Sequence, residues 1–530
     1  VATNLLNEGR NSFETARVRL AALLAQTDPE NVPPNLREMD YALKVNQGIL
    51  DVHTGKFARA RSRIAESQND SAQAATQLEQ AQTHLKNAHD RFQEANQLDK
   101  RQYQSHALLA KVLVDLDQPV EALQELDQAI ICLQTVLKNR DRPQESDVPT
   151  INPALNDSKI KDSRLAKLYR SKAQIVIELA RRDQTLSPAR WDEAVQALTE
   201  AIERNNDQYE RAEDLANRAQ FRLRAFELND GRPTEPELAL ADARRSSELD
   251  PRLAIAQYWK TVALMDLEQY DEVLEVSQSY LDLVGQGGLQ TLGDPRALGN
   301  LAAVRQLRGV CFLRKQRRNL GDDPEAIDGF VQAIDEFTLS LELQPDSAPV
   351  LLSRGLAHLA LSSYKLATKD FDAVLKVVRR PRVNSQVAGQ PQPPRPLSDL
   401  NDAERRLALT ALTARARTRV AESAQERDPE PSLRLALADL ELAMSVAGTD
   451  SLLADLKVES GLILAELANR LKSKFSDDPQ QLRLQLNQFT SLRNRAFGLI
   501  NQGLQAADET KRIALTRKLD AQKPLIDSLR

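Results

Sequence analysis

The sequence has few of the residues on which β-sheets depend. Of its 530 residues only 4% are aromatic and 18 are glycine, whereas sheets favour aromatic and β-branched residues and use many glycine turns. Because 41% of the residues are hydrophobic and 28% are charged, we expect a folded, all-helical protein. The length exceeds what one hydrophobic core usually serves, which favours several domains or a repeat array.

The sequence also lacks an excess of one charge and any long apolar run. The net charge is −5 and no long basic block is present, which disfavours nucleic acid as a partner. No apolar stretch approaches the roughly 20 residues of a membrane span, and no signal peptide follows Val1. We favour a cytoplasmic protein, but an exported form is possible if a leader is removed before Val1, so the compartment stays open.

Residue patterns for catalysis or metal binding are missing too. Cys132 and Cys311 lie in apolar helical stretches, which predicts buried, unreactive thiols. His84 and His89 are five residues apart and do not share a helix face, so they predict no metal site. The glycine-rich stretch 285–295 follows no expected strand, which favours a loop over a phosphate site. We therefore predict no catalytic, cofactor-binding or metal-binding residue, and a protein that is not an enzyme.

What the sequence does contain is a recurring spacing of small residues. Gly355 is followed twelve residues later by Ala367, and then by Phe371 and Val374 after four and seven more. Small residues on two helices let the backbones approach where the helices cross, so this spacing predicts a helical hairpin. The same distances recur in three other places: Ala110, Ala122, Leu126 and Ala129; Thr261, Val273, Ser277 and Tyr280; and Gly48, Ala60 and Ile64.

Four further units carry the two small residues farther apart. The intervening inserts are rich in proline, aspartate and glycine or serine, which predicts extended loops that end in helix caps. The segment Leu-Ala-Leu-Ala-Asp stands verbatim at Leu238–Asp242 and at Leu435–Asp439. The pairs are Ala173 and Ala194, Ala219 and Ala239, Gly309 and Ala333, and Ala414 and Ala436.

These units resemble the tetratricopeptide repeat, a 34-residue helix–turn–helix. Gly355, Ala367 and Phe371 match its small residue at position 8, its alanine at position 20 and its larger residue at position 24. The resemblance implies an all-α, right-handed superhelical solenoid of about eight to nine hairpins, several with extended A–B loops. The chain could be the repeat region of a larger bacterial protein.

The repeat pattern gives an expected domain organisation. A ninth, degenerate unit begins around Gly461 and pairs with residues 480–505, and residues 72–98 read as one long polar helix. The expected divisions are an N-terminal capping helix (1–38), repeat units with the long polar helix (39–138), a linker (139–160), the main array (161–378), a proline-rich linker (379–399), one more unit (400–447), and degenerate units with a C-terminal cap (448–530).

The resemblance also implies where a partner would bind. In this family the first helices of the hairpins, the A helices, line a concave groove, where long polar side chains beside an aromatic ring would suit an extended peptide. Leu352, Leu356 and Leu359 would instead form an apolar pocket, or a face covered by the following linker. The candidate partner-binding residues are Lys167, Arg170, Gln174, Gln220, Arg224 and Tyr258, and neighbouring groove positions are Ile177, Glu178, Glu213, Ala216 and Leu223.

Several hypotheses of function remain open at this point. The first is a non-catalytic scaffold that binds protein segments along the groove. The others are a regulatory region of a larger signalling protein, such as a serine/threonine kinase, and a structural subunit of an envelope or extracellular assembly. The inserts could form a second contact edge for a partner or another copy, with Trp191 as its anchor, unless Trp191 packs within its own repeat.

Overall fold

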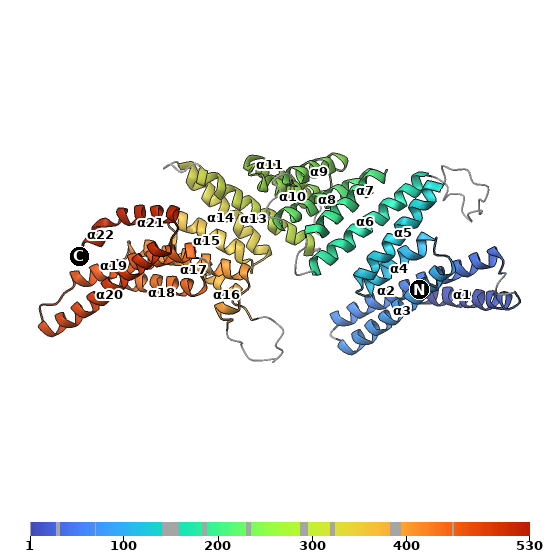
Figure 1. The fold of residues 1–530 in the computed structure, drawn as a ribbon, viewed down its shortest axis with the longest axis horizontal. Helices are drawn as coiled ribbons and strands as arrows, with labels where there is room; N and C mark the ends of the chain where they lie inside the picture. Colours follow the sequence, from blue (N-terminus) through green and yellow to red (C-terminus); the bar gives the residue numbers. More distant parts are fainter. Residues whose placement is uncertain are drawn as a thin grey trace. The chain divides into compact units, whose positions relative to one another are not determined.

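The computed structural model describes residues 2–27, 32–68, 70–139, 158–182, 188–228, 235–286, 295–318, 324–381, 394–447 and 450–529. Within these ranges the chain is helical and has no strand, which confirms the all-α prediction (Figure 1). The chain divides into two compact units, Val1–Glu268 and Gln269–Arg530. The predicted domain boundaries stay a prediction, and residues 140–157 and 382–393 of the two predicted linkers lie outside the described residues.

In the part of the first unit that the structure describes, four helical hairpins are flanked by one helix at each end. In each hairpin an A helix packs against the B helix that follows it, as α2·α3, α4·α5, α6·α7 and α8·α9. The helices are α1 (Ala2–Leu24), α2 (Pro34–Ser67), α3 (Ser71–Leu98), α4 (Tyr103–Asp115), α5 (Pro119–Asn139), α6 (Ser158–Arg182), α7 (Pro188–Arg204), α8 (Gln208–Leu228), α9 (Glu235–Leu249) and α10 (Ala254–Asp266).

The second unit contains four more hairpins, α13·α14, α15·α16, α17·α18 and α19·α20. The expected ninth unit around Gly461 is thus present as α19·α20. The helices are α11 (Tyr270–Gln286), α13 (Pro295–Arg318), α14 (Pro324–Leu343), α15 (Ala348–Ala360), α16 (Tyr364–Val378), η3 (Leu397–Asp399), α17 (Asp402–Ser423), α18 (Glu430–Val446), α19 (Asp450–Ser473), α20 (Pro479–Ala506), α21 (Glu509–Ala521) and α22 (Lys523–Asp527). Consecutive helical hairpins, as expected, are thus present within each unit, and the superhelical arrangement and its handedness stay predictions.

Glycine on an A helix makes room for phenylalanine on the B helix. A Cβ on Gly355 would lie 2.7 Å from the ring of Phe371, and one on Gly309 would lie 2.6 Å from Phe337. Real Cβ atoms do not approach carbon that closely, so these crossings require glycine. Both rings are fully buried, which explains why the sequence spacing pairs a small residue with an aromatic one.

The first predicted hairpin is wrong. Gly48, Ala60 and Ile64 all lie on the unbroken helix α2, and Ile64 is 57% exposed. The partner of Gly48 is Phe92 on α3, whose ring would lie 2.6 Å from an added Cβ. Residues 72–98 are therefore part of the B helix of the first hairpin, α3. This agrees with the prediction of one long helix over this stretch.

The inserts of the extended hairpins are partly helical. In the short hairpin α15·α16 the A helix ends five residues after Gly355, whereas α6 and α8 each continue for nine residues after Ala173 and Ala219. The A helices are thus longer by about one turn. Residues 183–187, 229–234 and 319–323 of three inserts lie outside the described residues.

The short hairpins turn through a left-handed residue that is not glycine. Asp117 (φ 66°) and Ser362 (φ 55°) occupy this conformation in the turns of α4·α5 and α15·α16, and Glu268 (φ 56°) occupies it just after α10. The Ser363 N–H donates to the His358 carbonyl at 2.8 Å and closes the turn of α15·α16. This tight turn is what limits the short units to a spacing of twelve.

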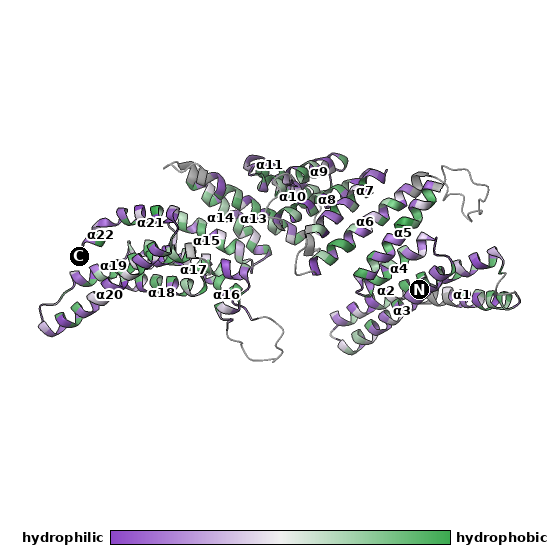
Figure 2. Cartoon of the chain, in the orientation of Figure 1, coloured by the Kyte–Doolittle hydropathy of each residue, from purple (hydrophilic) through white to green (hydrophobic). Residues whose placement is uncertain are grey.

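Polar and apolar residues alternate around the helices. Figure 2 shows both kinds of residue on every labelled helix. None of the described helices is long and apolar enough to cross a membrane. The apolar stripes instead meet inside the hairpins, where they form the buried clusters.

Candidate functional site

Arg170, one of the predicted partner-binding residues, forms ion pairs with other residues of the chain. Its Nε and Nη2 atoms donate to the two carboxylate oxygens of Asp214 at 2.5 and 2.8 Å, and Asp214 is fully buried. The neighbouring carboxylate of Glu210 lies 3.3 Å from Nη2 and 3.5 Å from the ammonium of Lys167. These contacts join α6 to α8, so Arg170 holds two A helices together, while Lys167 remains 58% exposed.

Two of the predicted residues have side chains that no other group engages. Gln174 on α6 is exposed and Gln220 on α8 is partly exposed. Within the described part of the chain, neither amide has a hydrogen-bond partner. Each follows the small residue of its A helix directly, Ala173 in α6 and Ala219 in α8, so the two amides occupy the same place in successive hairpins.

The last two predicted residues lie where α8 and α10 meet. Arg224 is exposed and pairs with Glu227 at 2.5 Å. Burial raises the pKa of Tyr258, and the charges of Arg224 and Glu227 act on the same ring. Burial and the nearby Glu227 also raise the pKa of Asp266 to about 6. Arg224 and Tyr258 are therefore brought together, with two carboxylates beside them.

Some of the expected groove positions are buried instead. Ile177, Ala216 and Leu223 are at most 3% exposed, because the longer A helices of α6·α7 and α8·α9 pack over a wider surface. Trp191 is buried as well, and its ring meets Phe221 of α8 edge-on with 6.2 Å between the centroids. The hypothesis of Trp191 as an exposed anchor is therefore wrong, because the ring packs between its own hairpin and the next.

A set of bridging cations was missed by the sequence analysis. Each directly precedes the small residue of its A helix and contacts both an acid on its own B helix and a polar group on the preceding B helix. Arg354 shows the arrangement: its Nη2 donates to Asp370 at 2.7 Å and its Nη1 to Thr338 at 3.3 Å. The bridging cations are Lys172, Arg218, Arg308, Arg354 and Arg415, and their acids are Glu193, Asp242, Glu336, Asp370 and Asp439.

The contact with the preceding B helix is the part that links hairpins. Lys172 donates to Asp127 of α5 at 2.8 Å, Arg218 to Thr199 of α7 at 2.9 Å, and Arg308 to Ser277 of α11 at 3.0 Å. Arg415 pairs with Asp372 of α16. The sequence did contain a pattern that could have identified these ion pairs, because four of the five acids follow the small residue of the B helix by three positions.

The bridging contacts also correct the register of one predicted unit. Arg415 and Arg419 bind Asp439 just as Arg218 and Arg222 bind Asp242. Ala416, directly after Arg415, is therefore the counterpart of Ala219, and it is 1% exposed. The sequence analysis chose Ala414, two residues earlier, which is also buried.

Two A helices of the second unit, α13 and α15, carry partly buried apolar side chains beside their bridging cations. Leu352, Leu356 and Leu359 of α15 are partly buried against the core, together with Val310 and Leu313 of α13. Part of the proline-rich segment that was expected to cover this face, residues 382–393, lies outside the described residues. The expected apolar side chains of α15 are thus present, and their covering by the proline-rich segment stays a prediction.

The described residues contain no group of histidine, cysteine and acidic side chains that could hold a metal ion. Cys311 is buried, its thiol donates to the Tyr270 carbonyl at 3.1 Å, and burial raises its pKa to about 12. Cys132 is partly exposed, and burial also raises the pKa of its thiol. Both cysteines are free, and both raised pKa values favour the unreactive thiol.

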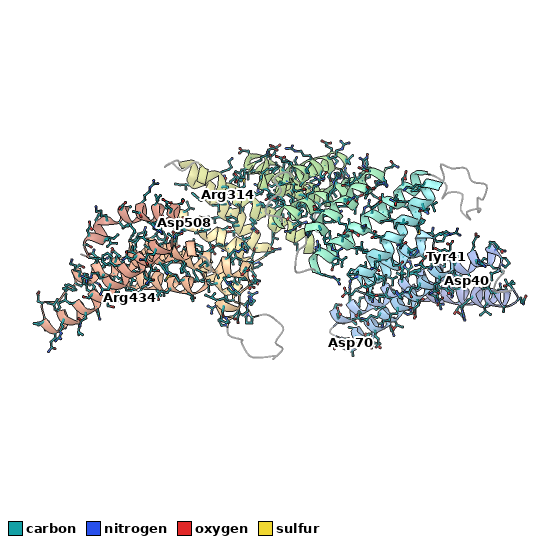
Figure 3. The ribbon with its side chains drawn as sticks, viewed as in Figure 1. Asp40, Tyr41, Asp70, Arg314, Arg434 and Asp508 are labelled. Carbon is teal, nitrogen blue, oxygen red and sulfur yellow. The ribbon has the colours of Figure 1, made fainter. Side chains whose placement is uncertain are left out.

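Side chains at helix ends and on helix surfaces have local roles. Asp70 and Asp508, both labelled in Figure 3, accept from backbone N–H groups at the starts of α3 and α21 at 2.9 and 2.8 Å. Arg434, also labelled, pairs with Glu430 one turn away at 2.7 Å. Such contacts cap helix ends or pair side chains one turn apart on a helix surface, and they do not mark a binding site.

No protein-family model matches the chain, and no curated protein matches its sequence. Among solved structures the chain is similar to tetratricopeptide repeat proteins. YrrB, described as a repeat protein with an unusual peptide-binding site, is 15% identical over 49% of this chain and 95% of its own, with a TM-score of 0.31. A protein from Parabacteroides merdae is 16% identical over 65% and 93% (TM-score 0.33), and the C-terminal part of one from Cytophaga hutchinsonii is 13% identical over 64% and 95% (TM-score 0.35). A likeness at this level says nothing about function.

Proposed function

We propose that the chain is a non-catalytic scaffold that binds an extended segment of another protein along the A helices α6 and α8. The observation that supports this is the pair of unengaged amides, Gln174 and Gln220, at the same position of successive hairpins. An amide side chain can donate to and accept from a peptide backbone at once. Two such groups in register suit a main chain that runs across the helices.

The remaining groups of the face fit this proposal. Arg170 is held by Asp214 and Glu210, so it contributes a rigid floor rather than a contact that must be ordered on binding. Lys167 on α6 and Arg224 on α8 are exposed cations. The same face could bind a segment in a free-standing scaffold, in a regulatory region of a larger signalling protein or in an envelope subunit. The test below applies equally to all three of these settings.

Site-specific crosslinking tests this proposal. A photoreactive amino acid at position 174 or 220 is expected to capture the same partner from cells, because both positions face one segment. Gln196 is the matched control, since it is an exposed glutamine on α7 of the same hairpin as Gln174. Capture from position 196 equal to that from 174 and 220, or capture from none of the three, would contradict the proposal.

A binding measurement then separates contact from folding. Once the partner is known, Gln174→Ala with Gln220→Ala is expected to weaken its binding by about tenfold or more, because two hydrogen-bonding groups are removed. Gln196→Ala should leave the affinity unchanged. Equal losses from both variants would place the interface elsewhere.

A further inference from the structure

His106 lies in a nearly closed site at the junction of the first two hairpins. It belongs to α4 and is 8% exposed. Its Nδ1 atom is 2.6 Å from the Glu125 carboxylate of α5, and its Nε2 atom is 3.2 Å from the carbonyl oxygen of Lys100, just after α3. Both ring nitrogens therefore face oxygen acceptors.

The two oxygens favour the protonated ring. A neutral imidazole has a hydrogen on one nitrogen only, so it can satisfy either Glu125 or the Lys100 carbonyl but not both. The imidazolium has a hydrogen on each nitrogen and satisfies both. The positive ring also compensates the charge of the Glu125 carboxylate, which is 29% exposed.

The surroundings of the ring connect three helices of the junction. Asn96 of α3 places its amide nitrogen 3.2 Å from Nδ1 of His106 and 3.5 Å from Glu125. Next to His106, Ser105 accepts from Tyr41 of α2 at 3.2 Å (Tyr41 is labelled in Figure 3). Titratable groups around the ring include Tyr41 from α2, Asp99 and Lys100 after α3, and Glu125 and Cys132 from α5.

Other contacts also hold the junction. Arg59 of α2 donates to the carboxylate and the carbonyl of Asp115 at 3.2 and 2.6 Å. The Cys132 thiol donates to the same Lys100 carbonyl as His106, at 3.4 Å, and burial raises its pKa. A change of pH between acidic and mildly alkaline values therefore acts on this junction mainly through His106.

We propose that His106 is a pH-controlled clasp that fastens the hairpin α2·α3 to the hairpin α4·α5. With the ring protonated, α4 is joined to α5 through Glu125 and to the end of α3 through the Lys100 carbonyl. With the ring neutral, it can donate to only one of the two oxygens, so α4 loses its bond either to Glu125 or to the Lys100 carbonyl. The first hairpin then opens more often while the rest of the array stays folded.

The direction of the pH dependence follows from the pKa shift. The hydrogen bond to Glu125 raises the pKa of His106 above its ordinary value of 6.5. The contribution of the pair to stability is thus complete below pH 6.5, and it is lost as the pH rises through the raised pKa of the folded state. The junction is expected to be tight in mildly acidic solution and looser in mildly alkaline solution.

Hydrogen exchange of the full chain tests the clasp. Protection factors for α3 and α4, corrected for intrinsic exchange, are expected to fall about tenfold between about pH 5.5 and about pH 8.5, the change that loss of one charged hydrogen bond produces. His106→Gln should abolish this dependence, because glutamine does not titrate. His84→Gln is the matched control, since His84 of α3 pairs with Asp51 of the same hairpin, and it should leave the dependence intact.

Two further measurements keep the test decisive if His106→Gln folds poorly. Glu125→Gln removes the carboxylate and should move the loss of protection to lower pH. The ring C–H resonances of His106 should titrate with a midpoint above 6.5. A midpoint at or below 6.5, a pH dependence retained in a folded His106→Gln variant, or protection in the unchanged chain that does not vary with pH would overturn the proposal.

Discussion

The hairpins α8·α9 and α17·α18 carry the same five-residue segment and the same buried ionic group, but they differ in its third contact. In both, two arginines of the A helix bind one aspartate of the B helix: Asp242 in the first hairpin and Asp439 in the second. In α8·α9 the bridging Arg218 reaches the neutral Thr199. In α17·α18 the bridging Arg415 reaches a second carboxylate, Asp372.

This difference separates two roles of the ionic group. The contact between arginine and aspartate inside the hairpin is the same in both, so it fixes how the A helix packs on the B helix. The contact with the preceding B helix varies in charge, so it tunes how strongly one hairpin adheres to the one before it. A repeat array can thus keep the fold of each hairpin and adjust each junction separately.

Removing the shared aspartate should have the largest effect. Asp242→Asn leaves Arg218 and Arg222 without a buried carboxylate and should destabilise α8 and α9 by about 3–5 kcal/mol. Asp439→Asn should cost less, because Arg415 retains Asp372. Hydrogen exchange of the two hairpins measures both losses, and Glu248→Gln on the exposed side of α9 is the control. Equal losses from the two variants would show that the third contact has no energetic role.

Substitution of Gly355, the small residue of α15, should give the next largest effect. The two hairpins compared above have alanine at this position, Ala219 and Ala416. Gly355→Ala should destabilise α15·α16 by about 1–3 kcal/mol, because the new Cβ would lie 2.7 Å from Phe371. Gly498→Ala on α20 is the matched control. Its Cβ would meet nothing within 4 Å, so it should stabilise α20 by about 0.5–1 kcal/mol. A stabilising Gly355→Ala would refute the close crossing.

The smallest effect should come from adding the missing charge. Thr199→Asp gives Arg218 the second carboxylate that Arg415 already has, and it should strengthen the junction of α7 and α8 by about 0.5–1 kcal/mol. The gain should fade with added salt, because the pair is partly exposed. Thr338→Asp makes the same change beside Arg354 in another hairpin. A gain of similar size there would generalise the comparison, and a loss in both would refute it.

The sequence predicts the short hairpins well and the long ones less well. The spacing of Gly355 and Ala367 is right because a tight turn leaves no freedom between the two helices. The spacing of Gly48 and Ala60 misleads because both residues lie on the single helix α2, where Gly48 is buried against α3 and Ala60 is exposed. The true partner, Phe92, lies 44 residues from Gly48, and no local pattern identifies it.

The candidate site was predictable only in part for a related reason. Gln174 is exposed and Gln220 is partly exposed, since their place follows from the position of one small residue on one helix. Arg170 occupies an equally regular position, but Asp214 of the next hairpin binds it. Whether a polar side chain is engaged depends on residues in the neighbouring hairpin, and single-helix periodicity carries no information about them.

The central claim is that A-helix side chains two residues apart have different roles: Arg218 holds hairpins together and Gln220 faces a partner. Hydrogen exchange of α8 and α9 in Arg218→Gln and Gln220→Ala tests it most directly. The account predicts that Arg218→Gln lowers protection in both helices by about a hundredfold, the loss expected when a buried pair is broken. Gln220→Ala should leave protection within about twofold, as for a surface substitution. Similar protection in the two variants would contradict the account.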